Sequence, residues 1–260
     1  MQQRIESIAQ TLHMAEEQRV PLPPLSETYE GLTAEQAYAI QSAWLAIKRR
    51  ERPVRLVGHK IGLTSLAMQQ LLGIDQPDYG FLLDSMLAAP GSTLRRADFI
   101  APRIVPEIAF WLSSDLQGPG VTIENVLAAT RGVSAALELV DSRIRDWRIK
   151  LVDTIADNAS SARVIVSERL VNPAEIDLGA ESVTLLRDGE RVGTGTGAAV
   201  LNHPASAVAW LANRLADFGV ALRAGQLILP GAMCSAVNVD AGATYRANFA
   251  HLGEVAIHFV

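Results

Sequence analysis

Cysteine is almost absent from this sequence, since Cys234 is its single representative. One cysteine excludes an intrachain disulfide framework, which favours a reducing compartment. No run approaches the 18 or more apolar residues of a membrane span, and the N-terminus lacks the apolar region of a signal peptide. These absences predict a soluble, cytoplasmic protein with no membrane partner.

Excess positive charge is also lacking. The net charge is −5, with 23 Lys and Arg against 28 Asp and Glu, so nucleic acid is not expected as a partner. Hydrophobic residues make up 49% and charged residues 20% of the 260 positions, which is typical of a globular protein with a substantial core.

The regular βα alternation of a Rossmann domain or a barrel is missing too. Apolar spacing predicts helices over residues 2–19 and from an N-cap at Thr33 to about Arg49, with Gln36 completing a capping box. A short helix capped by Thr64 or Ser65 is expected to run through Leu72. Many short strands follow, which predicts an α+β protein with an antiparallel or mixed sheet. We expect a helical region over 1–55, packed on a β-rich functional domain over 56–260.

Two glutamates stand inside strand-like apolar runs, Glu107 in 101–111 and Glu138 in 133–140. An ionised carboxylate in such surroundings is costly unless a cation meets it. A shared Mg²⁺ or Mn²⁺ is one explanation, because both ions prefer oxygen ligands. The alternative is that each glutamate pairs with a nearby arginine (Arg103, Arg143) or faces solvent.

Lys60 is a third candidate, because it lies in the apolar run 56–63, where it either reaches an anion in a site or extends to solvent. The loop 75–81 carries Asp78 and Tyr79 toward a possible site edge. The small polar stretch 154–161 is expected to be a turn that lines the site, with Asp157, Asn158 and Ser160.

Other chemistry-bearing motifs favour structural explanations. The glycine-rich run 193–197 lacks the spacing of a phosphate loop. His203 precedes a predicted helix and is expected to be a turn or capping residue. No Gly-x-Ser-x-Gly motif surrounds Ser65 or Ser160, which argues against a serine hydrolase.

Taken together, several motifs resemble one family. They are Gly58-His-Lys-Ile-Gly-Leu-Thr-Ser65, Gln76-Pro-Asp-Tyr-Gly-Phe81, Pro102-Arg-Ile-Val-Pro-Glu-Ile-Ala-Phe110, Leu137-Glu-Leu-Val-Asp-Ser-Arg-Ile-Arg-Asp-Trp147, Asp153-Thr-Ile-Ala-Asp-Asn-Ala-Ser160 and Ala199-Val-Leu-Asn-His-Pro204. In order and spacing they resemble the 2-keto-4-pentenoate (2-hydroxypenta-2,4-dienoate) hydratases of the fumarylacetoacetate hydrolase superfamily. The resemblance covers nearly the whole chain and implies a mixed β-roll with an N-terminal helical region.

The resemblance implies a role for individual residues. Glu107 and Glu138 match two of the family's three metal-binding acids, whereas the third position is Val105, which cannot bind a metal. Lys60 and Asp78 match positions assigned to catalysis. Ser65, Tyr79 and Ser160 are expected to bind substrate.

The implied activity is metal-dependent hydration of 2-hydroxypenta-2,4-dienoate, or a C5-substituted analogue, to a 4-hydroxy-2-oxo acid in meta-cleavage catabolism of aromatic compounds. One alternative is a 4-oxalocrotonate-type decarboxylase. A second, kept open by Val105, is a weakened paralogue that binds or stabilises a partner. The family also implies a homo-oligomer and an association with a pathway enzyme.

Overall fold

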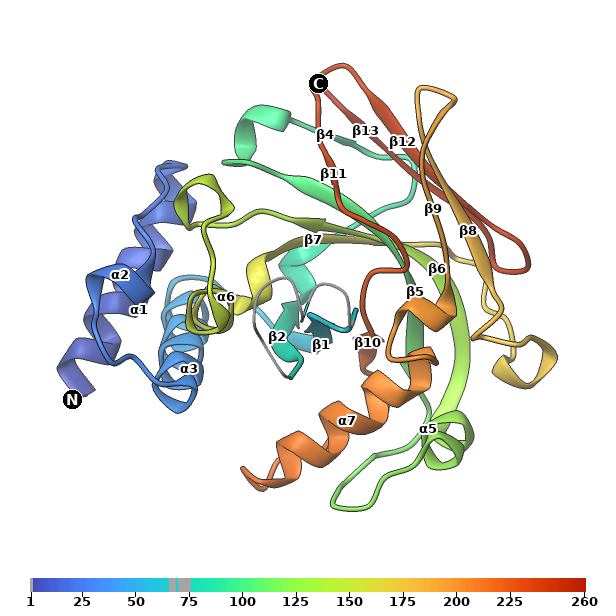
Figure 1. Cartoon of the computed structure of the whole chain (residues 1–260), viewed down its shortest axis with the longest axis horizontal. Coiled ribbons are helices and arrows are strands. Elements are labelled where there is room, and N and C mark those ends of the chain that lie inside the picture. Colours follow the sequence, from blue (N-terminus) through green and yellow to red (C-terminus); the bar gives the residue numbers. More distant parts are fainter. Residues whose placement is uncertain (1, 66–68, 70–75) are drawn as a thin grey trace.

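Two β-sheets form the body of the protein, and helices cover their edges and faces (Figure 1). The computed structural model describes residues 2–65, 69 and 76–260. The helix predicted through Leu72 therefore lies largely outside the described residues. Within them, no helix is long and apolar enough to cross a membrane.

The N-terminal helices pack together at one side of the larger sheet (Figure 1). They are α1 (Gln2–Gln18), α2 (Leu25–Thr28) and α3 (Ala34–Glu51). The capping box predicted at Thr33 and Gln36 is present: the Thr33 side chain accepts from the Gln36 N–H, and the Gln36 side chain accepts from the Thr33 N–H. Trp44 and Ile47 of α3 are buried as the helical spacing predicted.

The larger sheet is mixed. Its strands run in the order β2 (Asp78–Leu83), β1 (Leu56–Gly62), β10 (Leu227–Leu229), β5 (Arg103–Leu112), β6 (Thr130–Val140), β7 (Ser161–Val166) and β3 (Leu87–Ala88), and β11 (Val237–Asn238) also pairs with β5. The β1–β10 and β3–β7 pairs are parallel, and the other pairs are antiparallel.

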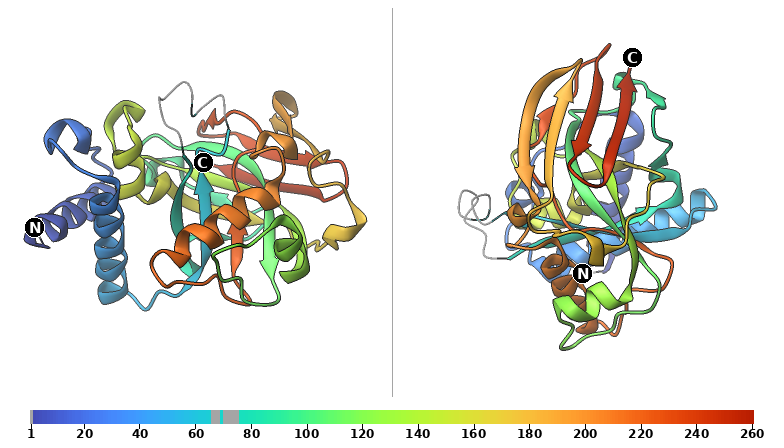
Figure 2. Two further views of the ribbon diagram at one scale, coloured as in Figure 1. Left: turned by 60° about the horizontal axis from the view of Figure 1, so that its bottom comes forward. Right: turned by 90° about the vertical axis from the view of Figure 1, so that its right-hand side faces the viewer.

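The smaller sheet contains β4 (Thr93–Leu94), β13 (Gly253–Phe259), β12 (Thr244–Phe249), β8 (Ser182–Arg187) and β9 (Glu190–Thr196) in that order. Its four longer strands stand side by side in the right-hand view of Figure 2. The hairpin predicted at 187–190 joins β8 to β9, with Asp188 and Gly189 both at positive φ.

The glycine-rich run 193–197 belongs to strand β9 and the short turn after it. A side chain at Gly195 would collide with the Met233 carbonyl oxygen of the neighbouring segment. These glycines therefore permit close backbone approach.

The described part of the chain contains further helices. They are α5 (Ile123–Ala129), α6 (Leu151–Ala156) and α7 (Pro204–Ala216), with 3₁₀ turns η1 (Asp84–Met86), η2 (Arg96–Asp98), η3 (Arg145–Trp147), η4 (Asn158–Ser160), η5 (Pro173–Glu175) and η6 (Gly197–Ala199). Of these helices, α6 packs against α3, and α5 packs against α7. His203 caps α7, because its Nδ1 accepts from the Ala205 N–H at 3.1 Å. The turn expected over 154–161 begins as helix, since α6 extends to Ala156. The α+β prediction, with a mixed sheet and N-terminal helices, is confirmed.

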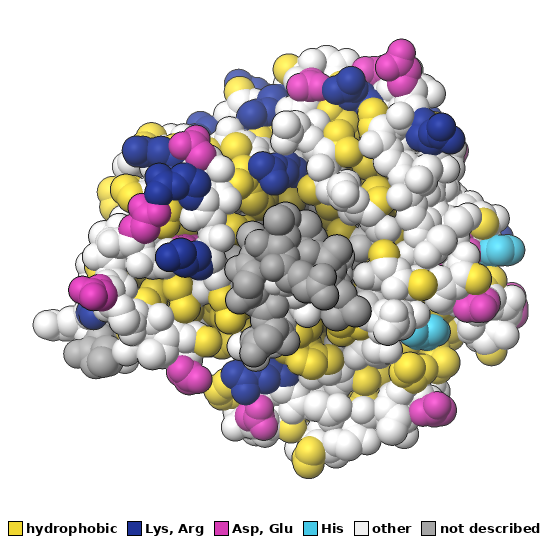
Figure 3. Space-filling model, in the orientation of Figure 1, with side chains coloured by type: hydrophobic (Ala, Val, Ile, Leu, Met, Phe, Trp, Pro, Cys, Tyr) yellow, Lys and Arg dark blue, Asp and Glu magenta, His cyan; other side chains and the backbone are white. Residues whose placement is uncertain are grey.

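Strand β5 separates two environments. Ile104, Ile108 and Phe110 point into the main apolar core, whereas Val105 and Glu107 alternate with them and face the other side. On the face of the molecule in Figure 3, acidic and basic side chains lie interspersed around the rim. Other charged side chains are instead buried in the interior, among them Lys60, Asp78, Glu107 and Glu138.

Candidate active site

Two buried carboxylates lie on neighbouring strands of the larger sheet. Glu107 on β5 and Glu138 on β6 are each 1% exposed. Across the two strands, Glu138 stands opposite Val105 and Glu107 stands opposite Ala136. Both acids therefore lie on the same face of the sheet, as diagonal neighbours on adjacent strands. Neither pairs with the arginines considered above, because Arg103 stacks over Trp147 and Arg143 pairs with Asp157.

Each carboxylate is held by one hydrogen bond from a distant segment. The Gly231 N–H donates to Glu107 Oε2 at 2.8 Å, and the Ser161 hydroxyl donates to Glu138 Oε1 at 2.8 Å. Gly231 has φ +129, and a side chain there would collide with Thr64. Glycine is therefore needed to bring this amide to Glu107.

Lys60 provides a positive charge beside Glu138. Its Nζ lies 3.3 Å from Glu138 Oε2 and donates to the Ala159 carbonyl at 3.2 Å. The ammonium is almost fully buried. Desolvation acts to lower the pKa of Lys60, but the carboxylates of Glu138, Asp78 and Glu107 outweigh it and raise the pKa. Lys60 thus stays protonated.

Asp78 is a third buried acid, on the strand next to Lys60. The register pairs Asp78 with Gly62 and Lys60 with Gly80, so glycines alternate with the functional residues. The Thr154 hydroxyl donates to Asp78 Oδ2 at 2.8 Å, while the buried Oδ1 has no hydrogen-bond partner among the described residues. Burial raises the pKa of Asp78.

The charges in this site do not balance. Three acids (Glu107, Glu138 and Asp78) face one cation, Lys60. Burial, followed by the nearby Glu138 carboxylate, raises the pKa of Glu107 well above its usual range. The deficit of positive charge and the oxygen donors fit a hard divalent cation, which would also relieve the repulsion between the glutamates.

Such a cation would take few ligands from the chain. Among the residues that the structure describes, no group of three or more His, Cys, Asp or Glu side chains is arranged to hold a metal. Glu107 and Glu138 would supply two carboxylates, and Mg²⁺ commonly keeps several waters. Val105, 5% exposed, faces the same side and belongs to neither apolar cluster of the protein. It therefore borders the carboxylates.

The three residues expected to bind substrate lie in different surroundings. Tyr79 is on the opposite face of β2 from Asp78, and its ring stacks on Tyr38 in the main core with centroids 4.4 Å apart. The Ser160 hydroxyl donates to Asp157 at 2.8 Å. Ser65 is half-buried, and its carbonyl accepts from the Gln69 N–H. Among the described residues, no hydrogen bond or ion pair joins these three side chains to Glu107, Glu138 or Asp78.

Sequence reasoning missed Ser161, Thr154 and Gly231, which hold the three acids. Ser161 directly follows the serine that was selected, and no local pattern distinguishes the two. Thr154 was included only as part of a polar stretch. Gly231 is 124 positions from Glu107, and the sequence contains no signal for that contact.

Comparison of the sequence with models of known protein families identifies the family of this chain. Residues 61–260 match the model described as fumarylacetoacetate (FAA) hydrolase C-terminal. The chain belongs to the fumarylacetoacetate hydrolase family. The matched region contains Asp78, Glu107 and Glu138, the three buried acids of the site. The predicted fold of the fumarylacetoacetate hydrolase type is confirmed.

Individual members of the family with similar sequences are hydratases. The chain is 43% identical to the 2-hydroxyhexa-2,4-dienoate hydratase of Comamonas testosteroni, covering 99% of this chain and 98% of that protein. It is 44% identical to the 2-keto-4-pentenoate hydratase of Burkholderia vietnamiensis, covering 98% and 97%. The predicted resemblance to the 2-keto-4-pentenoate hydratases is thereby confirmed.

A solved structure shares the whole fold. The 4-oxalocrotonate decarboxylase from Pseudomonas putida G7, complexed with magnesium and adipate, superposes with a TM-score of 0.96 at 33% identity, covering 100% of this chain and 98% of that one. The chain is thus similar in sequence to hydratases and similar in fold to a decarboxylase.

Proposed function

We propose that the protein hydrates 2-hydroxypenta-2,4-dienoate, or a C5-substituted analogue, to a 4-hydroxy-2-oxo acid in meta-cleavage catabolism. The observation that carries the proposal is the buried set of three acids and one lysine, in which one carboxylate oxygen of Asp78 is left without a partner. The identities of 43% and 44% to hydratases over nearly the whole chain support the reaction class.

In this proposal Glu107 and Glu138 hold Mg²⁺ or Mn²⁺. The ion, when bound, supplies a Lewis acid for the carboxylate and 2-oxygen of the substrate. Lys60 remains protonated beside Glu138, and its ammonium binds and orients the same negatively charged end of the substrate. The burial of these groups strengthens each electrostatic contact.

Asp78 moves the protons. Its raised pKa allows Oδ1 to carry a proton, which it delivers to C5 while the 2-hydroxyl is deprotonated, so that the dienol becomes an α,β-unsaturated ketone. The resulting carboxylate accepts a proton from the water that adds at C4. The 2-hydroxyl releases its proton to solvent, and C3 takes one proton from solvent in its place, so the overall reaction adds one water. Thr154 holds Oδ2 and keeps Oδ1 directed at the reacting atoms.

A 4-oxalocrotonate-type decarboxylation is the second candidate. The full-length superposition on a decarboxylase favours it, and the chemistry also begins from a bound 2-oxo acid, whose carbonyl accepts the electrons released with CO₂. We rank hydration first because the identities of 43% and 44% to hydratases are higher than the 37% to the 4-oxalocrotonate decarboxylase of Pseudomonas sp. (strain CF600).

The test is turnover of 2-hydroxypenta-2,4-dienoate with and without Mg²⁺ or Mn²⁺, followed by identification of the product. Lys60→Met should lower kcat/KM by about tenfold or more, which corresponds to about 1.4 kcal/mol of transition-state binding. The exposed Lys150→Met is the matched control and should retain wild-type kinetics.

Three results would count against hydration. Release of CO₂ from 4-oxalocrotonate without hydration of the dienoate would establish the decarboxylase. Absence of both reactions in a protein that still binds Mn²⁺ would favour a weakened paralogue. Wild-type kinetics in Lys60→Met would remove Lys60 from the mechanism.

A further inference from the structure

A strained turn lies directly behind the Lys60–Glu138 pair. Asn158, Ala159 and Ser160 have φ values of 56°, 49° and 54°, three consecutive non-glycine residues in the left-handed region. This conformation is costly for L-residues and persists only where surrounding contacts enforce it. Such strain often marks a segment whose shape serves a function.

The turn contacts both members of the pair. The Ala159 carbonyl accepts from Lys60 Nζ at 3.2 Å, and the Ser161 hydroxyl, at the end of the turn, donates to Glu138 Oε1 at 2.8 Å. A shift of this turn would therefore move the lysine and the glutamate together.

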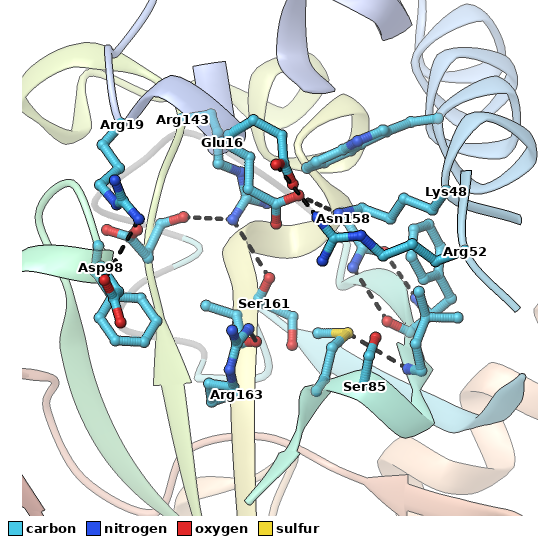
Figure 4. A pocket seen from close by; sticks show the side chains of 18 residues that line it. Glu16, Arg19, Lys48, Arg52, Ser85, Asp98, Arg143, Asn158, Ser161 and Arg163 are labelled. Atoms are coloured by element: carbon cyan, nitrogen blue, oxygen red, sulfur yellow. Dashed lines mark hydrogen bonds and ion pairs between the residues drawn. The ribbon is translucent and has the colours of Figure 1, made fainter. Parts of the chain in front are cut away.

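The turn is buried, and one side of it borders a cavity. Asn158 and Ser161 line a cavity of about 340 Å³, which Lys48 of α3 and Arg52, the residue directly after that helix, also line (Figure 4). Hydrogen bonds act together with this burial to hold the left-handed conformation of the turn in place.

Asn158 makes the central hydrogen bonds. Its Oδ1 accepts from the Phe81 N–H at 2.8 Å, and its Nδ2 donates to the Phe81 carbonyl at 3.1 Å, so its amide clamps strand β2 (Figure 4). Gly80 leaves the space for this clamp, since a side chain there would collide with Asn158. Asparagine is also among the residues that best tolerate positive φ.

We propose that Asn158 is a positioning residue, which fixes the strained turn on β2 and thereby sets the place of Lys60 opposite Glu138. Asn158 does not touch the substrate in this arrangement. The inference rests on the proposed function for its kinetic consequence, while the position of Lys60 can be measured without any turnover.

The direct measurement uses the small number of lysines. The chain has three, Lys48, Lys60 and Lys150, so a spectrum of protein labelled with ¹⁵N at lysine Nζ is simple, and Lys60→Met assigns the Lys60 signal. We expect Asn158→Ala to shift or broaden the Lys60 signal and leave the signal of Lys150, which lies outside the cavity, in place. With the dienoate, kcat should fall by about tenfold or more while KM changes less than about threefold.

Two further variants keep the test decisive. Asn158→Gly removes the clamp but accepts positive φ, so it gives the answer if Asn158→Ala does not fold, and it should show the same changes. The matched control is Asn202→Ala, because Asn202 is an exposed asparagine at φ 65; it should lower thermal stability and leave the Lys60 signal and kcat unchanged.

An unchanged Lys60 signal in folded Asn158→Ala or Asn158→Gly would overturn the proposal. A shifted signal in a protein whose wild type shows no turnover would instead support the positioning role and reject the proposed reaction.

Discussion

At the scale of single residues, Val105 has the sharpest chemical consequence. It pairs across the strands with Glu138 and shares a face with Glu107, so an acid at this position would point at the two carboxylates. We predict that Val105→Glu tightens Mn²⁺ binding by at least about tenfold, or about 1.4 kcal/mol, because a third negative charge attracts a dication better than water does. Calorimetric titration at one pH measures this.

Val105→Gln is the matched control, since it adds nearly the same volume without the charge. It should leave the affinity for Mn²⁺ close to that of the wild type. Flat affinity together with a lower melting temperature in Val105→Glu would instead make position 105 a packing position, and Glu107 would lose its proposed role as a metal ligand.

His59, next to Lys60, predicts how stability depends on pH. Its ring is 7% exposed, and neither ring nitrogen has a hydrogen-bond partner among the described residues. Burial lowers the pKa of His59 from 6.5 to about 4. Between pH 6.5 and about pH 4, the imidazole of His59 is therefore protonated in the unfolded chain and neutral in the folded protein. The free energy of unfolding should consequently fall by about 2 kcal/mol between pH 7 and pH 5.

Urea unfolding of the wild type and His59→Phe at both pH values tests this assignment. The variant cannot bind the proton, so its free energy of unfolding should decrease by about 2 kcal/mol less than that of the wild type over the same interval. Equal decreases in the two proteins would assign the acid sensitivity to other groups.

At the scale of elements, the β1–β2 hairpin depends on alternating glycines. Gly62 stands opposite Asp78, and a side chain there would collide with Asp78 Oδ1. Gly62→Ala should therefore displace the proposed proton carrier and lower kcat by about tenfold to a hundredfold. Mn²⁺ affinity should be unchanged, because Glu107 and Glu138 lie on other strands.

Ile61→Val provides the control on the same strand. Ile61 faces the main core, so this change should cost about 0.5–1.5 kcal/mol of stability and leave kcat intact. A fall in Mn²⁺ affinity in Gly62→Ala as large as its fall in kcat would show that the hairpin also shapes the metal site.

At the scale of the whole molecule, the unbalanced internal charge couples metal binding to stability. At free Mn²⁺ about 100-fold above its dissociation constant, binding to the folded state alone adds about 2.7 kcal/mol. For a chain of this length that should raise the melting temperature by roughly 5 to 10 °C, and a chelator should reverse the shift. Glu138→Gln keeps the shape but loses one charge, so its shift should be much smaller. Equal shifts in both proteins would place the ion elsewhere.

The sequence by itself determined the local features. Helix spacing and the Thr33 capping box depend on neighbouring residues, as does the hairpin at Asp188 and Gly189, so they could be predicted directly. The acids at 107 and 138 stood out because a charge within an apolar strand requires a partner. Motif order and spacing also predicted the family.

Only the tertiary structure decided which groups meet. The partner of Glu138 is Lys60, 78 positions away, and the choice between Ser160 and Ser161 depends on how a left-handed turn enters β7. The pairing of β2 with β1 places Asp78 on the face of the sheet that carries the site. Tyr79, the next residue of the strand, therefore points to the opposite face and into the core. These outcomes follow from cross-strand register and backbone strain between distant segments, which arise only when the segments pack together and which local sequence patterns do not encode.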